Sequence, residues 1–438
     1  MPQTTYPIPI GIRWPGEMNA RNPSAKRKLL VLDTSYTLEM IRARKLEASV
    51  TCRDLDGFFD HVWSIHPFAT LLTSEKWGPR FGRPTTYELS DRHTFIEGKV
   101  GRSQALRSVF AVNFLISQLG LFIELLRLVR RERINAVRVS SPLYVGLFGW
   151  LLSRLSGIPL VVRVGGNYDK IFETTGRPLE PRLLRGRRVE KIVERFVFRR
   201  AELVAGANQD NLDFALANGA VPGRTTLFRY GNLLDPGHLT DPARRALDER
   251  YLGELSVEPG GFLLYVGRLE PVKHPDHLLE VLARVRRKGF PVKAVLAGEG
   301  SLRDELASQA ARLGLEGQVI LPGNVSQDRL AQLYVAAGVV VSPHTGRALG
   351  EAAFAAAPVA AYDVDWQGEL ITDGVTGALV PYAKVDLLAN AVERLLSDRA
   401  RAKRLGSALR QRASEMLDPE RLNAHERATY TQLLEPHR

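Results

Sequence analysis

Hydrophobic positions along the chain fall into two patterns that alternate from residue 28 onward. Short apolar runs are typical of strands buried on both faces of a parallel sheet. Longer segments with apolar residues three and four positions apart are typical of helices that cover such a sheet. In the first half of the chain, the runs predicted to be strands are 28–33, 49–51, 61–65, 136–140, 160–164, 202–206 and 225–229.

The second half repeats this alternation after a charged, proline-containing stretch at 235–261. Two such segments in series predict an α/β protein with two Rossmann-like, doubly wound parallel sheets facing across a cleft. The polar stretch 73–101, broken by Pro and Gly, is predicted to be a long loop. The strands predicted in this half are 262–266, 292–297, 318–321, 339–342, 359–362 and 378–380.

This pattern divides the 438 residues into four segments. A chain of this length exceeds one typical hydrophobic core, which also favours two domains. The predicted segments are an irregular lead-in at 1–27, an N-terminal domain at 28–235, a C-terminal domain at 236–415, and a helix at 416–438 that packs back toward the N-terminal domain.

Net charge and cysteine content limit the possible binding partners and the cellular compartment. The net charge of +12 favours acidic partners, namely nucleotide phosphates, nucleic acid or an anionic membrane surface, without choosing among them. Cys52 is the only cysteine, which excludes an internal disulfide and favours the cytoplasm. No signal peptide is expected within 1–27. Charged side chains interrupt the apolar stretches 109–129 and 143–162, which are therefore expected to be buried rather than membrane-spanning.

A strand–loop–helix–strand unit at 262–300 carries the first candidate site. Gly267 ends a buried strand, and the loop after it holds Arg268 and Lys273, five residues apart. Because open parallel sheets bind ligands at the carboxyl edge of their strands, both cations can reach one anion. Arg offers a planar fork for a phosphate and Lys a compact charge. Gly298 ends the next strand at the same edge. Two solvated loop cations would explain the pair equally well.

The second candidate site is the loop–helix junction at 342–358. Backbone amides of Thr345, Gly346 and Arg347 are expected near the helix N-terminus, where the helix dipole favours a diphosphate. Glu351 is expected in the first turn of that helix, where its carboxylate can accept hydrogen bonds from ribose hydroxyls. Taken alone, Glu351 is better explained as an ordinary helix-start glutamate.

Other strand ends supply further candidates. Gly165, Gly166 and Asn167 follow a strand of the first half, although a tight turn with φ > 0 would also require glycine there. Asp33 ends the first strand and would serve equally well as a helix cap.

The sequence gives little support for a metal site. Asp-x-Asp triplets occur at 54–56 and 363–365, a pattern that is common by chance. No His/Cys cluster has metal-ligand spacing, and neither a P-loop nor a nucleophile elbow is present. No metal or other cofactor is therefore expected.

Together these motifs resemble those of the retaining GT-B glycosyltransferases of family 4. The resemblance is strong over 262–397 and weaker in the first half. It implies a nucleotide-sugar donor bound mainly by the second domain and an acceptor bound by the first. Arg268 and Lys273 match the pair that grips the donor diphosphate, and Glu351 matches the second glutamate of the E-x7-E motif, which holds the ribose. The matching segments are VGRLEPVKH, LAGEG, EAAFAAAPVAAYD and DGVTGALVP.

One position departs from the family pattern. Pro343 stands where the first glutamate of the E-x7-E motif is expected, and HTGRAL replaces the usual E-G-F-G loop. The missing carboxylate touches the donor sugar in the family, so the sugar and the stereochemical course stay open. Glu369 is the nearest substitute, and the Gly165–Asn167 turn is a candidate for sugar or acceptor contacts.

The resemblance implies an enzyme that transfers a sugar from a nucleoside-diphosphate donor to a glycan or lipid-linked acceptor, with retention and without a metal. The alternatives are a nucleotide-sugar epimerase on the same fold and a non-catalytic nucleotide- or glycan-binding protein, which Pro343 favours. Nucleic-acid binding is disfavoured because no nucleic-acid module is recognised. The expected location is the cytoplasm, either in solution or on the inner face of a membrane through the arginines of 127–133 and 182–200, which solvated helix faces would also explain.

Overall fold

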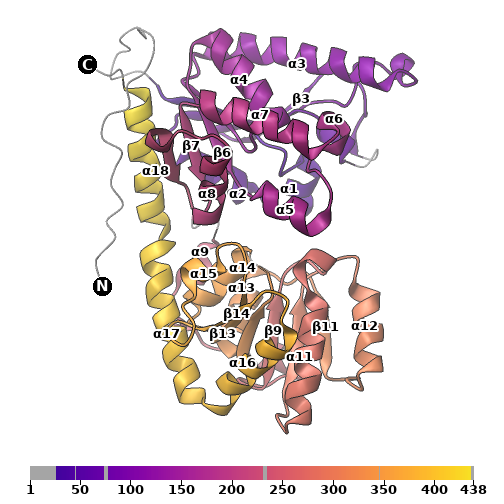
Figure 1. Cartoon of the computed structure of the whole chain (residues 1–438), viewed down its shortest axis with the longest axis vertical. Helices are drawn as coiled ribbons and strands as arrows, with labels where there is room; N and C mark the ends of the chain where they lie inside the picture. The colour runs from indigo at the N-terminus through magenta and orange to yellow at the C-terminus, as the bar shows by residue number, and fades with distance from the viewer. Residues whose placement is uncertain (1–25, 45, 74–76, 230–233, 345, 436–438) are drawn as a thin grey trace. The chain divides into compact units, whose positions relative to one another are not determined.

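The computed structural model describes residues 26–44, 46–73, 77–229, 234–344 and 346–435 (Figure 1). The chain forms two compact units. Unit 1 comprises Met1–Arg229 with Leu422–Arg438, and unit 2 comprises Tyr230–Arg421. These divisions fall a few residues away from the predicted ones, and the last helix, α18 (Pro419–Leu434), joins unit 1 from Leu422.

Unit 1 is built on an eight-stranded sheet with the order β3-β4-β2-β1-β5-β6-β7-β8. Every neighbouring pair is parallel except β3 and β4, which are antiparallel. The strands are β1 (Lys28–Leu32), β2 (His61–His66), β3 (Thr85–Ser90), β4 (His93–Glu97), β5 (Ala136–Val139), β6 (Leu160–Val164), β7 (Leu203–Gly206) and β8 (Thr225–Leu227).

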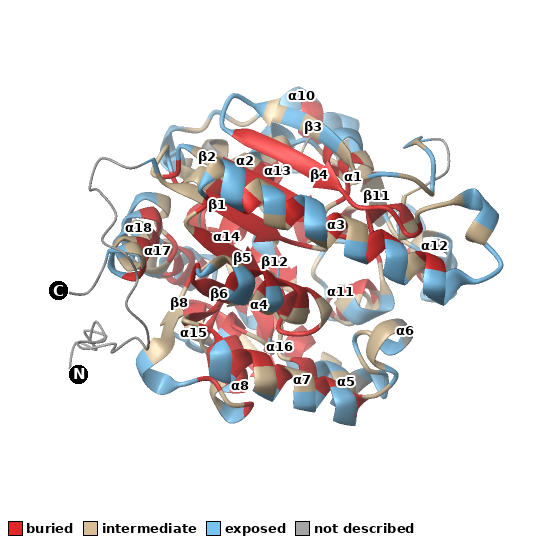
Figure 2. Cartoon of the chain, turned by 90° about the horizontal axis from the view of Figure 1, so that it is seen from above, coloured by how far each residue is buried: buried red, intermediate tan, exposed pale blue. Residues whose placement is uncertain are grey.

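Both faces of this sheet are covered, which explains why its central strands are continuous apolar runs. Leu30 and Leu32 of β1 pack with α3, α4, α7 and α8 on one face. Leu29 and Val31 pack with Tyr430 of α18 on the other. In Figure 2 these strands are red, whereas the helices carry pale blue outer faces. The helices are α1 (Leu38–Arg44), α2 (Glu47–Thr51), α3 (Phe110–Glu132), α4 (Tyr144–Ser156), α5 (Tyr168–Thr175), α6 (Pro181–Leu184), α7 (Arg187–Arg200) and α8 (Gln209–Ala217).

Unit 2 is built on a six-stranded, fully parallel sheet with the order β11-β10-β9-β12-β13-β14. Its chain order reverses between β9 and β12, the type of position at which such sheets bind ligands. The strands are β9 (Phe262–Val266), β10 (Lys293–Ala297), β11 (Val319–Gly323), β12 (Val339–Ser342), β13 (Val359–Asp363) and β14 (Ala378–Pro381).

Helices also cover both faces of the unit 2 sheet. Leu263 of β9 packs with α11, α12 and α16, and Leu264 packs with α13, α14 and α17. The helices are α9 (Pro236–Leu239), α10 (Glu249–Glu254), α11 (Pro275–Arg287), α12 (Arg303–Arg312), α13 (Gln327–Ala336), α14 (Arg347–Phe354), α15 (Gln367–Leu370), α16 (Val385–Ser397) and α17 (Arg399–Met416).

Two predictions of secondary structure are wrong. The run 49–51 is the end of helix α2, from which Val50 reaches a small core with Leu38 and Phe95. The predicted loop 73–101 contains β3 and β4. Its polar composition misled the prediction because β3 is an antiparallel edge strand with alternating exposure, and such strands need only one apolar face.

Candidate active site

The loop after β9 is fixed by backbone contacts with the end of β10. The Gly267 N–H donates to the Ala297 carbonyl at 3.1 Å, and the Leu269 N–H donates to the Glu299 carbonyl at 3.0 Å. Gly298 has φ +152°, and a Cβ there would lie 1.9 Å from the Gly267 carbonyl oxygen. The glycine therefore lets the two strand ends approach closely, which holds the backbone that carries Arg268.

Lys273 lies on a short 3-10 turn, Pro271–Lys273, directly before α11. Its Nζ is 3.1 Å from Nδ1 of His344, in the loop after β12. Burial and, to a smaller extent, the charge of Arg268 lower the pKa of Lys273 to about 8, although the Asp365 carboxylate partly opposes the shift. The ammonium is thus a desolvated charge, which an incoming anion would stabilise.

Glu351 lies in the second turn of α14 rather than in the predicted first turn, because the helix begins at Arg347. The residue is 2% exposed. The Tyr334 hydroxyl of α13 donates to Oε2 at 2.9 Å, and burial followed by the Glu351 charge raises the Tyr334 pKa well above its usual value. Oε1 is 2.9 Å from Arg347 Nε but has no aligned hydrogen bond, so it retains capacity to accept one from a ligand.

These groups line one cavity of about 250 Å³ within unit 2. Arg268 and Lys273 come from the loop after β9, and Arg347 comes from the start of α14. Three cations and one carboxylate therefore surround this cavity. This arrangement suits an anionic ligand that also carries hydroxyl groups. The other lining residues are Tyr265, Val266, Gly267, Gln327, Leu330, Val340, Val341, Ser342, Pro343, His344, Gly346, Ala348, Leu349 and Glu351.

Thus the structure brings together Gly267, Arg268, Lys273, Gly346, Arg347 and Glu351 of the predicted site, whereas Thr345 lies outside the described residues. Gly298 does not line the cavity and acts on the backbone instead. Glu369, on α15, does not line it either.

Sequence reasoning missed three residues that build this site. His344 contacts Lys273, Tyr334 contacts Glu351, and Gln367 fixes the loop after β12. Gln367 is fully buried, donates from Nε2 to the Ser342 carbonyl at 3.1 Å and accepts from the Ser342 hydroxyl at 2.7 Å. Their partners are 17 to 71 residues away in the chain, so no local pattern marks them.

The candidates of unit 1 have structural partners of their own. Asp33 pairs with Arg53 and accepts from the Ser35 N–H at 2.8 Å. Burial raises the Asp33 pKa, but the Arg53 charge and the Ser35 hydrogen bonds outweigh it and lower the pKa to about 2. Asn167 caps α5 and donates to Asp210 at 3.2 Å.

The turn at Gly165 and Gly166 does not require glycine for its backbone conformation. Neither residue has a positive φ. A Cβ at Gly166 would meet only ordinary contacts at 3.5 Å. The interpretation as a tight turn that needs φ > 0 is therefore wrong.

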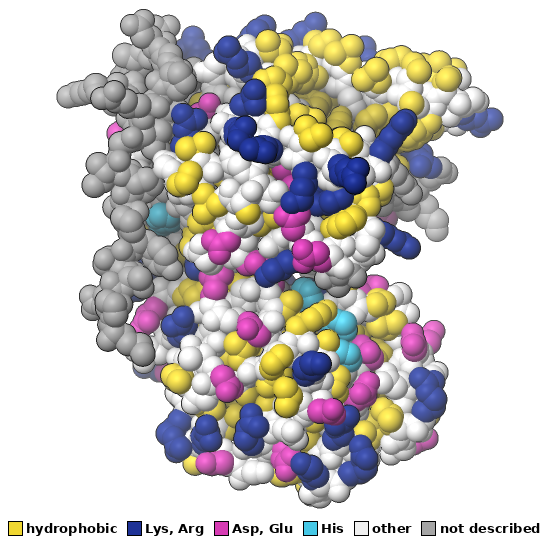
Figure 3. Space-filling model, in the orientation of Figure 1, with side chains coloured by type: hydrophobic (Ala, Val, Ile, Leu, Met, Phe, Trp, Pro, Cys, Tyr) yellow, Lys and Arg dark blue, Asp and Glu magenta, His cyan; other side chains and the backbone are white. Residues whose placement is uncertain are grey.

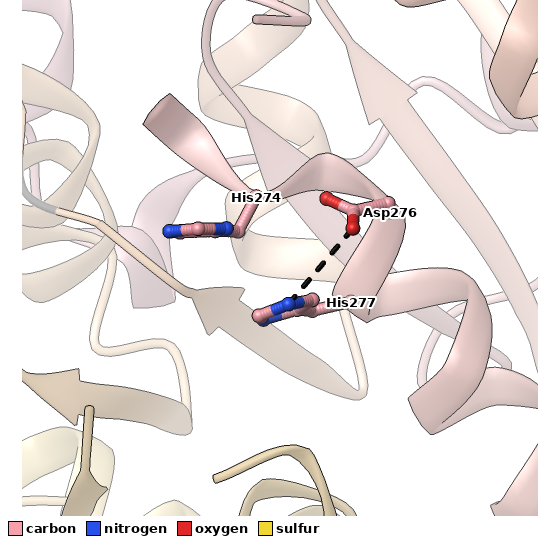
Figure 4. A group of neighbouring side chains, drawn as sticks. All are labelled: His274, Asp276 and His277. Carbon is pink, nitrogen blue, oxygen red and sulfur yellow. Dashed lines mark ion pairs between the residues drawn. The ribbon is translucent and has the colours of Figure 1, made fainter. Parts of the chain in front are cut away.

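Asp56 and the histidine cluster have protein partners of their own. Asp56 accepts hydrogen bonds from Asn423 and Arg427 of α18. His274, Asp276 and His277 are close together at the start of α11 (Figure 4). The two imidazoles stack at 4.6 Å with an interplanar angle of 16°, so their in-plane lone pairs do not converge on one ion. Each ring also bonds a tyrosine hydroxyl, Tyr382 at 2.6 Å and Tyr362 at 3.0 Å.

Comparison with known sequences finds similarity that includes much of unit 2. Residues 254–412 match the family described as Glycosyl transferases group 1. The chain is 29% identical over 262 residues to alpha-D-kanosaminyltransferase of Streptomyces kanamyceticus, which covers 57% of this chain and 64% of that one. It is 32% identical over 207 residues to D-inositol 3-phosphate glycosyltransferase of Nocardia farcinica, covering 45% and 42%. The chain thus spans less than two thirds of the length of these curated relatives.

Comparison with solved structures covers both units. HepE of Anabaena in complex with UDP matches with a TM-score of 0.66 and 20% identity, covering 92% of this chain and 100% of that one. Sucrose-phosphate synthase of Thermosynechococcus elongatus matches with a TM-score of 0.68 and 18% identity, covering 93% and 99%. The chain therefore has the GT-B fold of these structures, and its residues 254–412 are similar to the family described as Glycosyl transferases group 1.

Proposed function

We propose that the protein is a glycosyltransferase that moves a sugar from a nucleoside-diphosphate sugar to a glycan or lipid-linked acceptor in the cytoplasm. The observation that carries this proposal is the unit 2 cavity, in which Arg268 and the desolvated Lys273 accompany the buried carboxylate of Glu351. A diphosphate requires concentrated positive charge, and a ribose requires an acceptor for its hydroxyls. Relatives named glycosyltransferases and a structural neighbour bound to UDP-glucose support this assignment.

The proposed mechanism depends on where negative charge develops during the transfer. Cleavage of the bond between the anomeric carbon and the diphosphate oxygen leaves negative charge on the departing diphosphate. Fixed cations that wait at that position stabilise the transition state more than the ground state. Lys273 and Arg268 take this role, while Glu351 holds the ribose through Oε1. We propose retention of the anomeric configuration because the site motifs resemble those of a retaining family.

Pro343 supports one competing function, a protein that binds a nucleotide or glycan without transfer, since it replaces a carboxylate at the cavity wall. The discriminating assay measures nucleoside-diphosphate release from UDP-, GDP- and ADP-glucose, with and without a glycan and lipid extract. Release that requires the extract supports transfer. Nucleotide binding without release from any donor supports the competing function.

Activity should persist in excess EDTA. The cations at the cavity supply the charge stabilisation that a divalent ion supplies in metal-dependent transferases. Turnover is compared in EDTA alone and in EDTA with excess Mg²⁺. Complete loss that Mg²⁺ reverses would contradict metal independence and direct attention to the acidic triplets or the His274–His277 cluster.

The pH dependence should report Lys273. Below its pKa of about 8 the side chain is the cation that binds diphosphate, and above it the charge is lost. We therefore expect kcat/KM for the donor to fall about tenfold per pH unit above this value. The control is Lys273→Arg, in which the guanidinium stays charged and the decline should disappear. A profile that is flat up to about pH 9.5 in the natural protein would contradict the assignment.

A further inference from the structure

Helix α3 carries apolar side chains on the face that points away from the sheet. Val112, Leu115, Ile116, Leu119 and Ile123 are between 39% and 67% exposed, and their three- and four-residue spacing aligns them as one stripe. We call these five residues the α3 stripe. Figure 3 shows hydrophobic side chains gathered along this helix. Surface helices normally carry polar residues there, and contiguous exposed apolar surface marks an interaction site.

The sequence-based expectation that 109–129 is buried is therefore only half correct. By length and composition α3 could cross a membrane, with a mean hydropathy of 1.6 over its best window. Its inner face is nevertheless tied to the domain, because the Ser117 hydroxyl donates to the Lys99 carbonyl at 2.8 Å and Gln118 Nε2 donates to the Pro67 carbonyl at 3.1 Å. Crossing a bilayer would break these bonds in hydrocarbon, where unpaired polar groups are costly. These hydrogen bonds favour a helix that lies along an interface over one that crosses the bilayer.

Cations border the α3 stripe at both ends. Arg127 and Arg130 continue the same helical face in its last turns and are exposed. At the other end, Arg107 lies just before the helix begins at Phe110. It lines a cavity of about 780 Å³ with Arg80 and with Arg102, whose guanidinium lies beside Gly120 of the helix. Within the described part of the chain, no carboxylate lines that cavity. An apolar stripe between two groups of arginines matches an acyl layer beneath anionic headgroups.

We propose that the α3 stripe docks on an anionic phospholipid bilayer, with its apolar side chains at the acyl boundary and the flanking arginines at lipid phosphates. The competing occupant is a second copy of the chain. Because both ends of the stripe are cationic, a symmetric pair along α3 would place arginines against arginines in either direction, which disfavours it. The proposal does not depend on glycosyl transfer, since the stripe belongs to unit 1 and the donor cavity to unit 2.

The test is flotation of the full chain with phosphatidylcholine vesicles that do or do not contain phosphatidylglycerol. We expect binding only with phosphatidylglycerol, fading as salt rises. Leu115→Glu with Leu119→Glu should lower partitioning about tenfold per side chain, since each substitution removes apolar area from the acyl boundary. The matched control, Leu313→Glu with Leu387→Glu, changes two exposed leucines of unit 2 and should bind like the natural protein.

A second variant tests the headgroup contacts. Arg107→Gln with Arg130→Gln should weaken binding to anionic vesicles about fivefold per charge and reduce its salt dependence. Nucleotide affinity, measured in the same preparations, should be unchanged in both variants, so a lipid failure is distinguishable from a donor-site failure. No flotation at low salt overturns the proposal. A salt-resistant dimer that the leucine variant disperses, without vesicle binding by the natural protein, assigns the stripe to a second copy instead.

Discussion

Lys273→Ala should lower kcat/KM for the nucleotide-sugar by about 100-fold or more, because it removes a preorganised charge at the departing diphosphate. Arg268→Ala should act in the same direction. Arg268 is more exposed, so solvent screens its charge and we expect a smaller loss, of about tenfold. The control variants are Lys403→Ala and Arg404→Ala, which remove exposed cations of α17 and should retain full activity.

The stability of Lys273→Ala separates a lost site from a lost fold. Burial depresses the pKa of Lys273, which means that the native state disfavours its charge at neutral pH. Removal of that charge should leave the melting temperature unchanged or raise it. Near-normal turnover in both Lys273→Ala and Arg268→Ala would contradict the diphosphate site, whereas a lowered melting temperature with lost activity would assign Lys273 a structural role.

Glu351→Gln should weaken nucleotide affinity by about 10- to 100-fold while turnover at saturating donor stays close to normal. A charged hydrogen-bond acceptor contributes about 1.5–3 kcal/mol, and its ribose contact exists in the ground state as well as the transition state. The substitution keeps the shape of the side chain, and the Tyr334 hydroxyl can still donate to the amide oxygen.

Calorimetry and steady-state kinetics on the same preparation measure the two effects of Glu351→Gln separately. Tyr334→Phe keeps the carboxylate but removes the donor to Oε2, so it should weaken affinity less. Glu305→Gln, an exposed glutamate of α12, is the matched control. Unchanged affinity with collapsed turnover would make Glu351 a catalytic residue rather than a ribose ligand.

The central strands and the cationic loop were predictable because their signals are local. Residues 262–266 are an apolar run that Gly267 ends, and the position of the next helix brings Lys273 to the same edge. The ion pair between Asp33 and Arg53 could not be predicted, because Arg53 comes from another element, 20 residues along the chain. The burial of Arg187 against Glu190 and Glu194, within the Arg-rich segment 182–200, was not predicted either.

The orientation of α3 could not be read from composition alone. Apolar residues occupy nearly its whole circumference, which is typical of a buried helix. Only the fold shows which side meets the sheet, because Leu121 and Leu125 pack there while Leu115 and Leu119 stay outside. Polar residues on the inner side, such as Gln118, are satisfied by loops that sequence spacing does not place.

The most direct test of the donor site compares the affinities of a nucleoside diphosphate and the matching monophosphate for the natural protein and Lys273→Ala. UDP and UMP serve as the first pair, because UDP occupies a structural neighbour. Calorimetry should show UDP binding the natural protein about tenfold or more tightly than UMP, and this advantage should nearly vanish in Lys273→Ala. An equal loss of affinity for both nucleotides, or an advantage of UDP that survives the substitution, would contradict the placement of the diphosphate at Lys273.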